Sequence, residues 1–79
     1  MLGQLIKRHI TLEPNQVNDF VQAATKCDFD VDIHYNRYVV DAKSILGVFG
    51  LDLTKPLTVE YSGYDKGFEQ FLSGHACEA

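Results

Sequence analysis

The sequence predicts an α+β protein, an open-faced β-sandwich in which a four-stranded, mostly antiparallel sheet carries three helices on one face. Four short segments alternate apolar and polar residues at a two-residue period. Apolar residues recur at spacings of three and four in segments that follow the first, third and fourth of these. The expected order is therefore strand, helix, strand, strand, helix, strand, helix (βαββαβα). A chain of 79 residues has room for one core, so we expect a single domain over residues 1–79.

The first half of the chain predicts a strand, a helix and a hairpin. Residues 5–12 alternate as a strand, with Arg8 as the exception on the apolar face. Pro14 suits a first helical turn, and the spacing after it predicts an amphipathic helix of about 13 residues. The apolar positions of that helix are Val17, Phe20, Val21, Ala24 and Cys27. Alternation over residues 28–35 predicts a second strand, which a turn at Asn36 and Arg37 joins to a third strand at residues 38–41.

The second half predicts two helices and the last strand. Ser44 is placed to cap a short helix over residues 45–49, and Gly50 is a suitable stop. Leu57, Val59 and Tyr61 alternate with polar residues in the last strand. The apolar residues of the closing helix are Phe68, Phe71 and Leu72.

Composition excludes several classes of function. A formal net charge of −4 opposes the counterion release that drives most nucleic-acid binding. No 18-residue apolar run or secretory signal is visible, so we expect a cytoplasmic chain that does not enter a membrane. Cys27 and Cys77 are expected to be free thiols, one buried and one on a frayed terminus. No ligand spacing supports zinc, and we expect no cofactor.

Three aspartates at alternate positions, Asp28, Asp30 and Asp32, superficially suggest a calcium loop. Such a loop needs glycine at its sixth position and glutamate at its twelfth, where this chain has Ile33 and Val39. Strand alternation explains the aspartates better.

The segment from Ala42 to Leu51, AKSILGVFGL, closely resembles the region around the regulatory serine of Gram-positive HPr proteins, whose usual form is KSIMGVMSL. HPr is the histidine-containing phosphocarrier of the sugar phosphotransferase system. The resemblance covers roughly residues 17–73, and its KSIxGVxxL motif is fairly specific. It implies a bacterial protein of sugar transport and carbon catabolite regulation, and its order of elements agrees with the order that periodicity predicts.

The resemblance also shows a departure from the family. HPr proteins carry a GxHARPA segment, whose histidine accepts phosphate from enzyme I and whose arginine helps to hold it. Here Glu13 stands in place of that histidine and Asn15 in place of that arginine. A solvated carboxylate is a poor substitute for a nucleophilic imidazole, so we expect no phosphohistidine and no catalytic residue. Glu13 is then an acidic residue beside the positive end of a helix, with an acyl phosphate as the alternative.

None of the three histidines is expected to replace the missing one. His9 lies within the first strand, His34 on the wet face of the second, and His75 in a tail expected to fray. None opens a helix whose backbone N–H groups would receive a phosphate.

The short helix carries the remaining candidate residues. The resemblance implies that Ser44 is a site of regulatory phosphorylation, while a capping hydroxyl is the alternative. It also implies that Leu46 and Phe49, with Lys43, bind partner proteins. Ile45, Val48 and Leu51 are expected to form the buried stripe, which leaves Leu46 and Phe49 on another side. A broader buried face is the alternative for these two residues.

Three functions follow. The first is a non-catalytic, monomeric HPr-like regulatory module that binds proteins, such as an HPr-type serine kinase, phosphotransferase-system proteins or a transcriptional regulator. The second is an active phosphocarrier of the sugar phosphotransferase system, against which the missing histidine argues. The third is a small metabolite-binding domain of ferredoxin-like topology, because its βαββαβ order is nearly the same.

Overall fold

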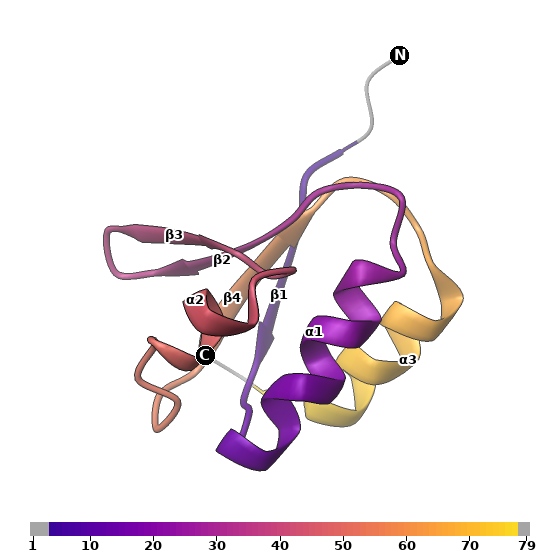
Figure 1. The fold of residues 1–79 in the computed structure, drawn as a ribbon. Coiled ribbons are helices and arrows are strands. Elements are labelled where there is room, and N and C mark those ends of the chain that lie inside the picture. The colour runs from indigo at the N-terminus through magenta and orange to yellow at the C-terminus, as the bar shows by residue number, and fades with distance from the viewer. Residues whose placement is uncertain (1–3, 78–79) are drawn as a thin grey trace.

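Four strands form one sheet in the computed structural model, which describes residues 4–77. The strands lie in the order β1-β4-β2-β3, and each neighbouring pair is antiparallel (Figure 1). Along the chain the elements are β1 (Ile6–Ile10), η1 (Pro14–Gln16), α1 (Val17–Thr25), β2 (Val31–Tyr35), β3 (Tyr38–Asp41), α2 (Ile45–Phe49), β4 (Leu57–Tyr61) and α3 (Lys66–His75). This order and the sheet confirm the predicted α+β fold. The helices of residues 4–77 are all too short or too polar to cross a bilayer.

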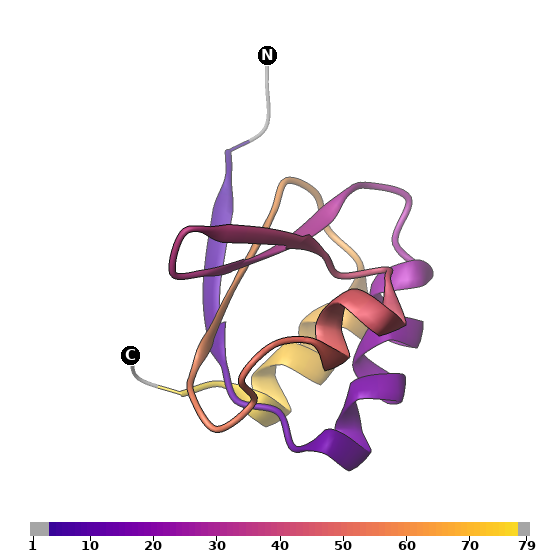
Figure 2. The ribbon, with the colours of Figure 1, turned by 60° about the vertical axis from the view of Figure 1, so that its left-hand side comes forward.

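The helices lie on one face of the sheet, and the opposite face is open (Figures 1 and 2). Alternate residues of the two central strands point into the layer between sheet and helices, where Val31, Ile33, Leu57 and Val59 are fully buried. Their neighbours on the open face are polar, and the Glu60 carboxylate there lies 3.8 Å from the ammonium of Lys7 in β1 and 3.1 Å from the His34 ring. The predicted alternation of apolar and polar residues is therefore confirmed, and it separates a buried face of the sheet from a solvent-exposed face.

The predicted first strand and first helix are both shorter in the structure. β1 ends at Ile10 because the N–H of Thr11 turns to the carbonyl of His75, although Leu12 beyond it remains buried. The predicted helix of about 13 residues is a 3-10 turn followed by nine residues of α-helix, Val17–Thr25. Its apolar stripe is buried as expected. The second strand begins at Val31, so the first two aspartates precede it.

The C-terminal segment is ordered against the sheet, which corrects the expectation of a frayed end. Ala76 pairs with Ile10 in an isolated antiparallel bridge, and Cys77 N–H donates to the carbonyl of His9 over 3.0 Å. His75 is the last residue of α3, and its ring stacks on Phe71 with 4.2 Å between ring centroids. Backbone hydrogen bonds to the outer edge of β1 hold Ala76 and Cys77 against the sheet.

A charged cluster explains the one basic residue on the apolar face of β1. The Arg8 guanidinium lies 2.7 Å from one carboxylate oxygen of Glu69 in α3. The other oxygen accepts a hydrogen bond of 2.5 Å from the Tyr61 hydroxyl. Burial, followed by this contact with Glu69, raises the pKa of Tyr61 to about 12. Arg8 can therefore face the helices because the Glu69 carboxylate on that side pairs with its charge.

Two loop residues adopt backbone conformations with positive φ. Asn36, with φ of 55°, occupies the left-handed region in the β2–β3 turn, which asparagine tolerates. Gly63, with φ of 154°, follows β4, and a Cβ atom there would lie 2.4 Å from the ring of Phe29. Only glycine fits at this second position.

Candidate partner-binding and phosphorylation site

Helix α2 begins at a serine whose hydroxyl caps it. Ser44 Oγ accepts a hydrogen bond of 3.2 Å from the N–H of Gly47, as predicted for an N-cap. The turn before the cap is held by Asp41, whose carboxylate accepts from Lys43 N–H over 2.9 Å and whose carbonyl accepts from Ser44 N–H over 3.0 Å. These bonds present the exposed Ser44 hydroxyl at the start of the helix. Gly50 follows the last residue of α2 in a right-handed conformation.

The side chain of Lys43 turns inward. Its ammonium donates a hydrogen bond of 3.1 Å to the carbonyl of Cys27, just beyond the end of α1. A cation at that position satisfies a carbonyl at a helix C-terminus and ties the α2 turn to α1. The Cys27 thiol is buried beneath it, and burial raises the pKa of this thiol above its ordinary value. The structure gives Lys43 an internal partner, and its contact with another protein stays a prediction.

Most of the apolar surface of α2 is accessible. Leu46 is 82% exposed and Phe49 is 49% exposed, whereas Val48 is fully buried. Leu46 and Phe49 are thus on the accessible side, and the alternative of a broader buried face is wrong. The predicted buried stripe is also partly wrong, because Ile45 is 38% exposed. Of the five residues of α2, Val48 at the fourth position reaches the core, while Ile45 at the first position remains outside.

An open apolar groove separates α2 from the β2–β3 hairpin. Its volume is about 490 Å³, and its walls are Tyr35, Tyr38, Val39, Val40, Leu46, Gly47, Gly50 and Leu51. Gly47 allows the close approach of the two elements, since a Cβ atom there would lie 2.7 Å from Val40 Cγ1. Leu46 forms one rim of the groove, while Phe49 does not line it. The aromatic and branched residues of the hairpin therefore extend the exposed surface of the helix.

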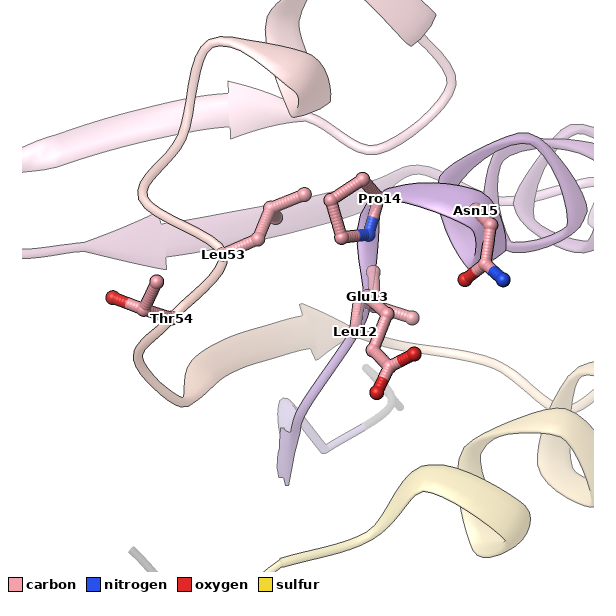
Figure 3. Close-up of a pocket in the computed structure, with 6 residues that line it drawn as sticks. All are labelled: Leu12, Glu13, Pro14, Asn15, Leu53 and Thr54. Atoms are coloured by element: carbon pink, nitrogen blue, oxygen red, sulfur yellow. The ribbon is translucent and has the colours of Figure 1, made fainter.

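The segment that precedes α1 forms a second candidate site. Glu13 adopts an extended conformation, with φ of −94° and ψ of 158°, and its N–H donates to the side-chain oxygen of Gln16 over 2.9 Å. Gln16 N–H in turn donates to the carbonyl of Glu13 over 2.8 Å. Figure 3 shows the side chains of Glu13 and Asn15 beside this turn, with Leu53 and Thr54 approaching from the loop before β4. The carboxylate of Glu13 is exposed at the start of the helical segment.

Two shallow hollows meet at Glu13. The first, of about 550 Å³, is lined by Leu12, Glu13, Pro14, Asn15, Leu53 and Thr54 (Figure 3). The second, of about 350 Å³, shares several of these residues and adds His75 at the end of α3. Neither hollow is lined by Lys or Arg among residues 4–77. A phosphoryl group in either hollow would face the Glu13 carboxylate without a strong cation to offset its charge.

The wall opposite Glu13 is a braced turn. Asp52 accepts hydrogen bonds from the N–H and the hydroxyl of Thr54, at 3.0 and 2.5 Å. The Thr54 hydroxyl bond, followed by its N–H, lowers the pKa of the Asp52 carboxyl. The turn therefore holds Thr54 in place at neutral pH.

Two of the three histidines lie apart from these two sites. His9 and His34 are on the open face of the sheet, where the His9 ring lies 3.2 Å from the Thr58 hydroxyl and His34 lies 3.1 Å from Glu60. His75 is the exception, since it lines a hollow that Glu13 also lines. Within residues 4–77, no three His, Cys, Asp or Glu side chains converge on a potential metal site.

The fold places the chain in the class of small open-faced β-sandwiches with the element order βαββαβα. Residues 6–70 match the family model described as PTS HPr component phosphorylation site. The chain belongs to the HPr family. Proteins of this family are phosphocarriers that interact with other components of the phosphotransferase system.

Two solved structures show the shared fold. One is the phosphocarrier protein HPr from Bacillus anthracis str. Ames, at 22% identity and a TM-score of 0.69, covering 90% of this chain and 96% of that one. The other is HPr-C-His from Thermoanaerobacter tengcongensis, at 21% identity and a TM-score of 0.70, covering 90% and 92% respectively.

Sequence reasoning missed two parts of these surfaces. Tyr38 and Val39 were predicted only as a short strand, although they are 63% and 59% exposed beside Leu46. Two adjacent large apolar residues in a short strand were the available signal, while the position of that strand at the sheet edge followed only from the fold. The turn of Asp52 and Thr54 was not predicted as a wall of the Glu13 hollow, because its proximity to Glu13 depends on the tertiary fold.

Proposed function

We propose that this HPr-family chain is a regulatory module that binds proteins through the surface of α2 and carries no phosphohistidine at the Glu13 position. The observation that supports it most is the 82% exposure of Leu46, the second residue of a helix capped by an exposed serine. An apolar side chain that contributes so little to its own core is available to another protein.

The proposed binding surface consists of Ser44, Leu46 and Phe49, with the groove wall at Tyr38 and Val39. Apolar and aromatic residues of this kind form the energetic centre of many protein interfaces. Lys43 contributes indirectly, because its bond to the Cys27 carbonyl holds the turn that positions Ser44. Partners of the expected kinds are an HPr-type serine kinase, other phosphotransferase-system proteins or a transcriptional regulator.

Phosphorylation of Ser44 would regulate this surface. The hydroxyl already accepts a hydrogen bond from Gly47 N–H, and phosphate oxygens could accept the same bond. A doubly charged group beside Leu46 would oppose burial of that side chain in an apolar interface and would favour a basic partner. Modification would therefore change which partner binds more than it changes folding.

The serine half of the proposal is tested with an HPr-type serine kinase and ATP. We expect wild-type protein to gain the mass of one phosphate and the Ser44→Ala variant to gain none. Ser62→Ala, which removes an exposed serine after β4, is the matched control and should be phosphorylated like the wild type. An unmodified wild type would leave Ser44 as a helix cap only.

The main rival is an active phosphocarrier, and His75 is the residue on which it would depend. His75 lines the hollow beside Glu13, but its Nδ1 lies 2.9 Å from the Phe71 carbonyl and its ring stacks on Phe71. It also ends a helix, where the backbone carbonyls repel a phosphate. These contacts argue against phosphotransfer through His75.

Incubation with phosphoenolpyruvate and enzyme I separates the two functions. We expect no acid-labile, histidine-linked phosphate in the mass spectrum, with an authentic HPr as the positive control. A phosphohistidine at His9, His34 or His75 would overturn the non-carrier proposal. Family membership also removes the main reason for a metabolite-binding ferredoxin-like domain, which rested on element order alone.

A further inference from the structure

The two edges of the sheet differ in how they are covered. At β1, the C-terminal segment bridges to Ile10 and donates to the carbonyl of His9, so part of that edge is already paired. At the other edge, β3 has β2 as its neighbour, and no other segment of residues 4–77 pairs with it. β3 therefore presents an edge that can accept another strand.

The register determines which backbone groups of β3 point outward. Ala42 N–H donates to the carbonyl of Val31 over 2.9 Å, which makes residues 31 and 42 a hydrogen-bonded pair. Bonding alternates along an antiparallel ladder, so Tyr38 and Val40 bond to β2 while Val39 and Asp41 direct their N–H groups away from it. The Val39 carbonyl also points outward. The free edge thus carries a donor and an acceptor on the same residue, at the middle of the strand.

The side chains along this edge do not protect it. Natural edge strands are often guarded by proline, lysine or inward-pointing charges, whereas Tyr38, Val39 and Val40 are all apolar or aromatic. Tyr38 is 63% exposed and Val39 is 59% exposed. Opposite charges stand at the two ends of this run, with Arg37 before it and Asp41 after it, and both are exposed.

This arrangement is complementary to itself. When two copies of the strand run antiparallel with Val39 opposite Val39, each Arg37 lies opposite the Asp41 of the other copy. The outward N–H and C=O groups of the two Val39 residues then meet as a hydrogen-bonded pair. Sliding the strands by one residue pairs outward groups with inward ones, and sliding by two sets Arg37 opposite either Val39 or the like-charged Lys43.

We propose that two copies of this chain associate through their β3 edges in that register, joining the two sheets into one continuous sheet. Opposite the charged pairs, on the helix face, Tyr38 of each copy lies opposite Val40 of the other. Tyr38 and Val40 also line the apolar groove beside Leu46, so the grooves of the two copies meet at the symmetry axis. The partner is therefore a second copy of this chain, where the sequence had led us to expect a monomer.

The association is weak and reversible. β3 has only four residues, so the contact belongs to the smallest class of interface, below roughly 1,200 Å² of total buried surface. It shares Tyr38 and Val39 with the groove wall of the proposed partner-binding surface, but it requires no phosphorylation and no other protein. Its test, the oligomeric state of the purified chain, therefore fails or succeeds separately from the test of the proposed function.

The proposal is tested by sedimentation velocity over protein concentrations from micromolar to millimolar. Amide hydrogen exchange is measured by NMR at the lowest and the highest of these concentrations. We expect a concentration-dependent dimer in which the Val39 and Asp41 amides gain protection, while those of Tyr38 and Val40 are protected at both concentrations. Arg37→Glu places like charges opposite each other twice and should weaken the dimer roughly tenfold. Lys55→Glu makes the same charge change in an exposed loop and should leave the dimer unchanged.

Val39→Lys provides a second variant, which places two ammonium groups at the symmetry axis. Circular dichroism verifies that each variant folds. If Val39→Lys fails to fold, Arg37→Glu alone decides the outcome, because Arg37 lies in a turn outside the strand and its replacement leaves the strand intact. A wild type that remains monomeric at millimolar concentration overturns the proposal. A dimer that Arg37→Glu leaves unchanged, or whose new protection falls on β1 amides, also overturns it and identifies a different interface.

Discussion

Replacing Leu46 with alanine tests whether this side chain serves partner binding or the stability of the fold. Burying a leucine completely stabilises a protein by about 1.5–3 kcal/mol. Leu46 is 82% exposed, so the folded chain gains only about a fifth of this, and Leu46→Ala should lower the free energy of unfolding by roughly 0.3–0.6 kcal/mol. The remaining area is free to be buried by a partner. Its loss should weaken binding by roughly 1–2.5 kcal/mol, or about 5- to 70-fold in Kd.

The assay compares urea unfolding with binding to an HPr-type serine kinase, measured by calorimetry on the same preparations. Val48→Ala is the matched control, because Val48 lies in the same helix and is fully buried. It should lower the free energy of unfolding by about 2 kcal/mol while binding changes little at a temperature where the variant is folded. Phe49→Ala should have an intermediate effect and lower the free energy of unfolding by about 1 kcal/mol, since Phe49 is half-buried.

A Leu46→Ala variant destabilised by about 3 kcal/mol would refute this reasoning, because the side chain would then belong to the core. The same holds for a variant with normal stability that binds the kinase as tightly as the wild type. In that case the exposure of Leu46 would have no connection to partner binding.

Two further predictions concern folding. Gly63→Ala should lower the free energy of unfolding by about 2–4 kcal/mol in a denaturant titration, because the new methyl group is strained at positive φ and clashes with Phe29; a change below about 0.5 kcal/mol would show that the loop relaxes freely. Tyr61→Phe should lower it by roughly 1–2 kcal/mol at neutral pH, because the bond to the Glu69 carboxylate is lost. The pKa of Tyr61 rises on folding from about 10 to about 12, so the wild type should lose stability as pH rises through that window. The phenylalanine variant should lack that loss, and parallel pH profiles for the two proteins would contradict the assignment.

The sequence predicted the α2 site better than the Glu13 site. A serine before a short apolar helix is a local signal, and the Ser44 cap is confirmed by its bond to Gly47. The surroundings of Glu13 are not local, because the hollows beside it combine residues from the loop before β4 and from the end of α3. No pattern near Glu13 could indicate that His75 would lie there.

Local chemistry also misled at the C-terminus and in α2. Terminal residues usually fray, yet Ala76 pairs with Ile10 because the outer edge of β1 offers unpaired backbone groups. Helical spacing placed Ile45 in the buried stripe, but Val48 is the one residue of α2 that is fully buried. Both outcomes depend on how a segment packs against the rest of the fold, which local spacing does not report.

The sequence by itself determined the order of elements, since side-chain alternation and helical spacing are properties of consecutive residues. It also determined the identity of Glu13 at the start of the first helical segment, and with it the chemistry available there. Only the tertiary structure decided that Arg8 could face the helices, because Glu69 lies 61 residues away and reaches it only after α3 packs on the sheet. The free edge of β3 was decided in the same way, because strand order in a sheet depends on which segments meet in space, and that information is not contained in any single stretch of the chain.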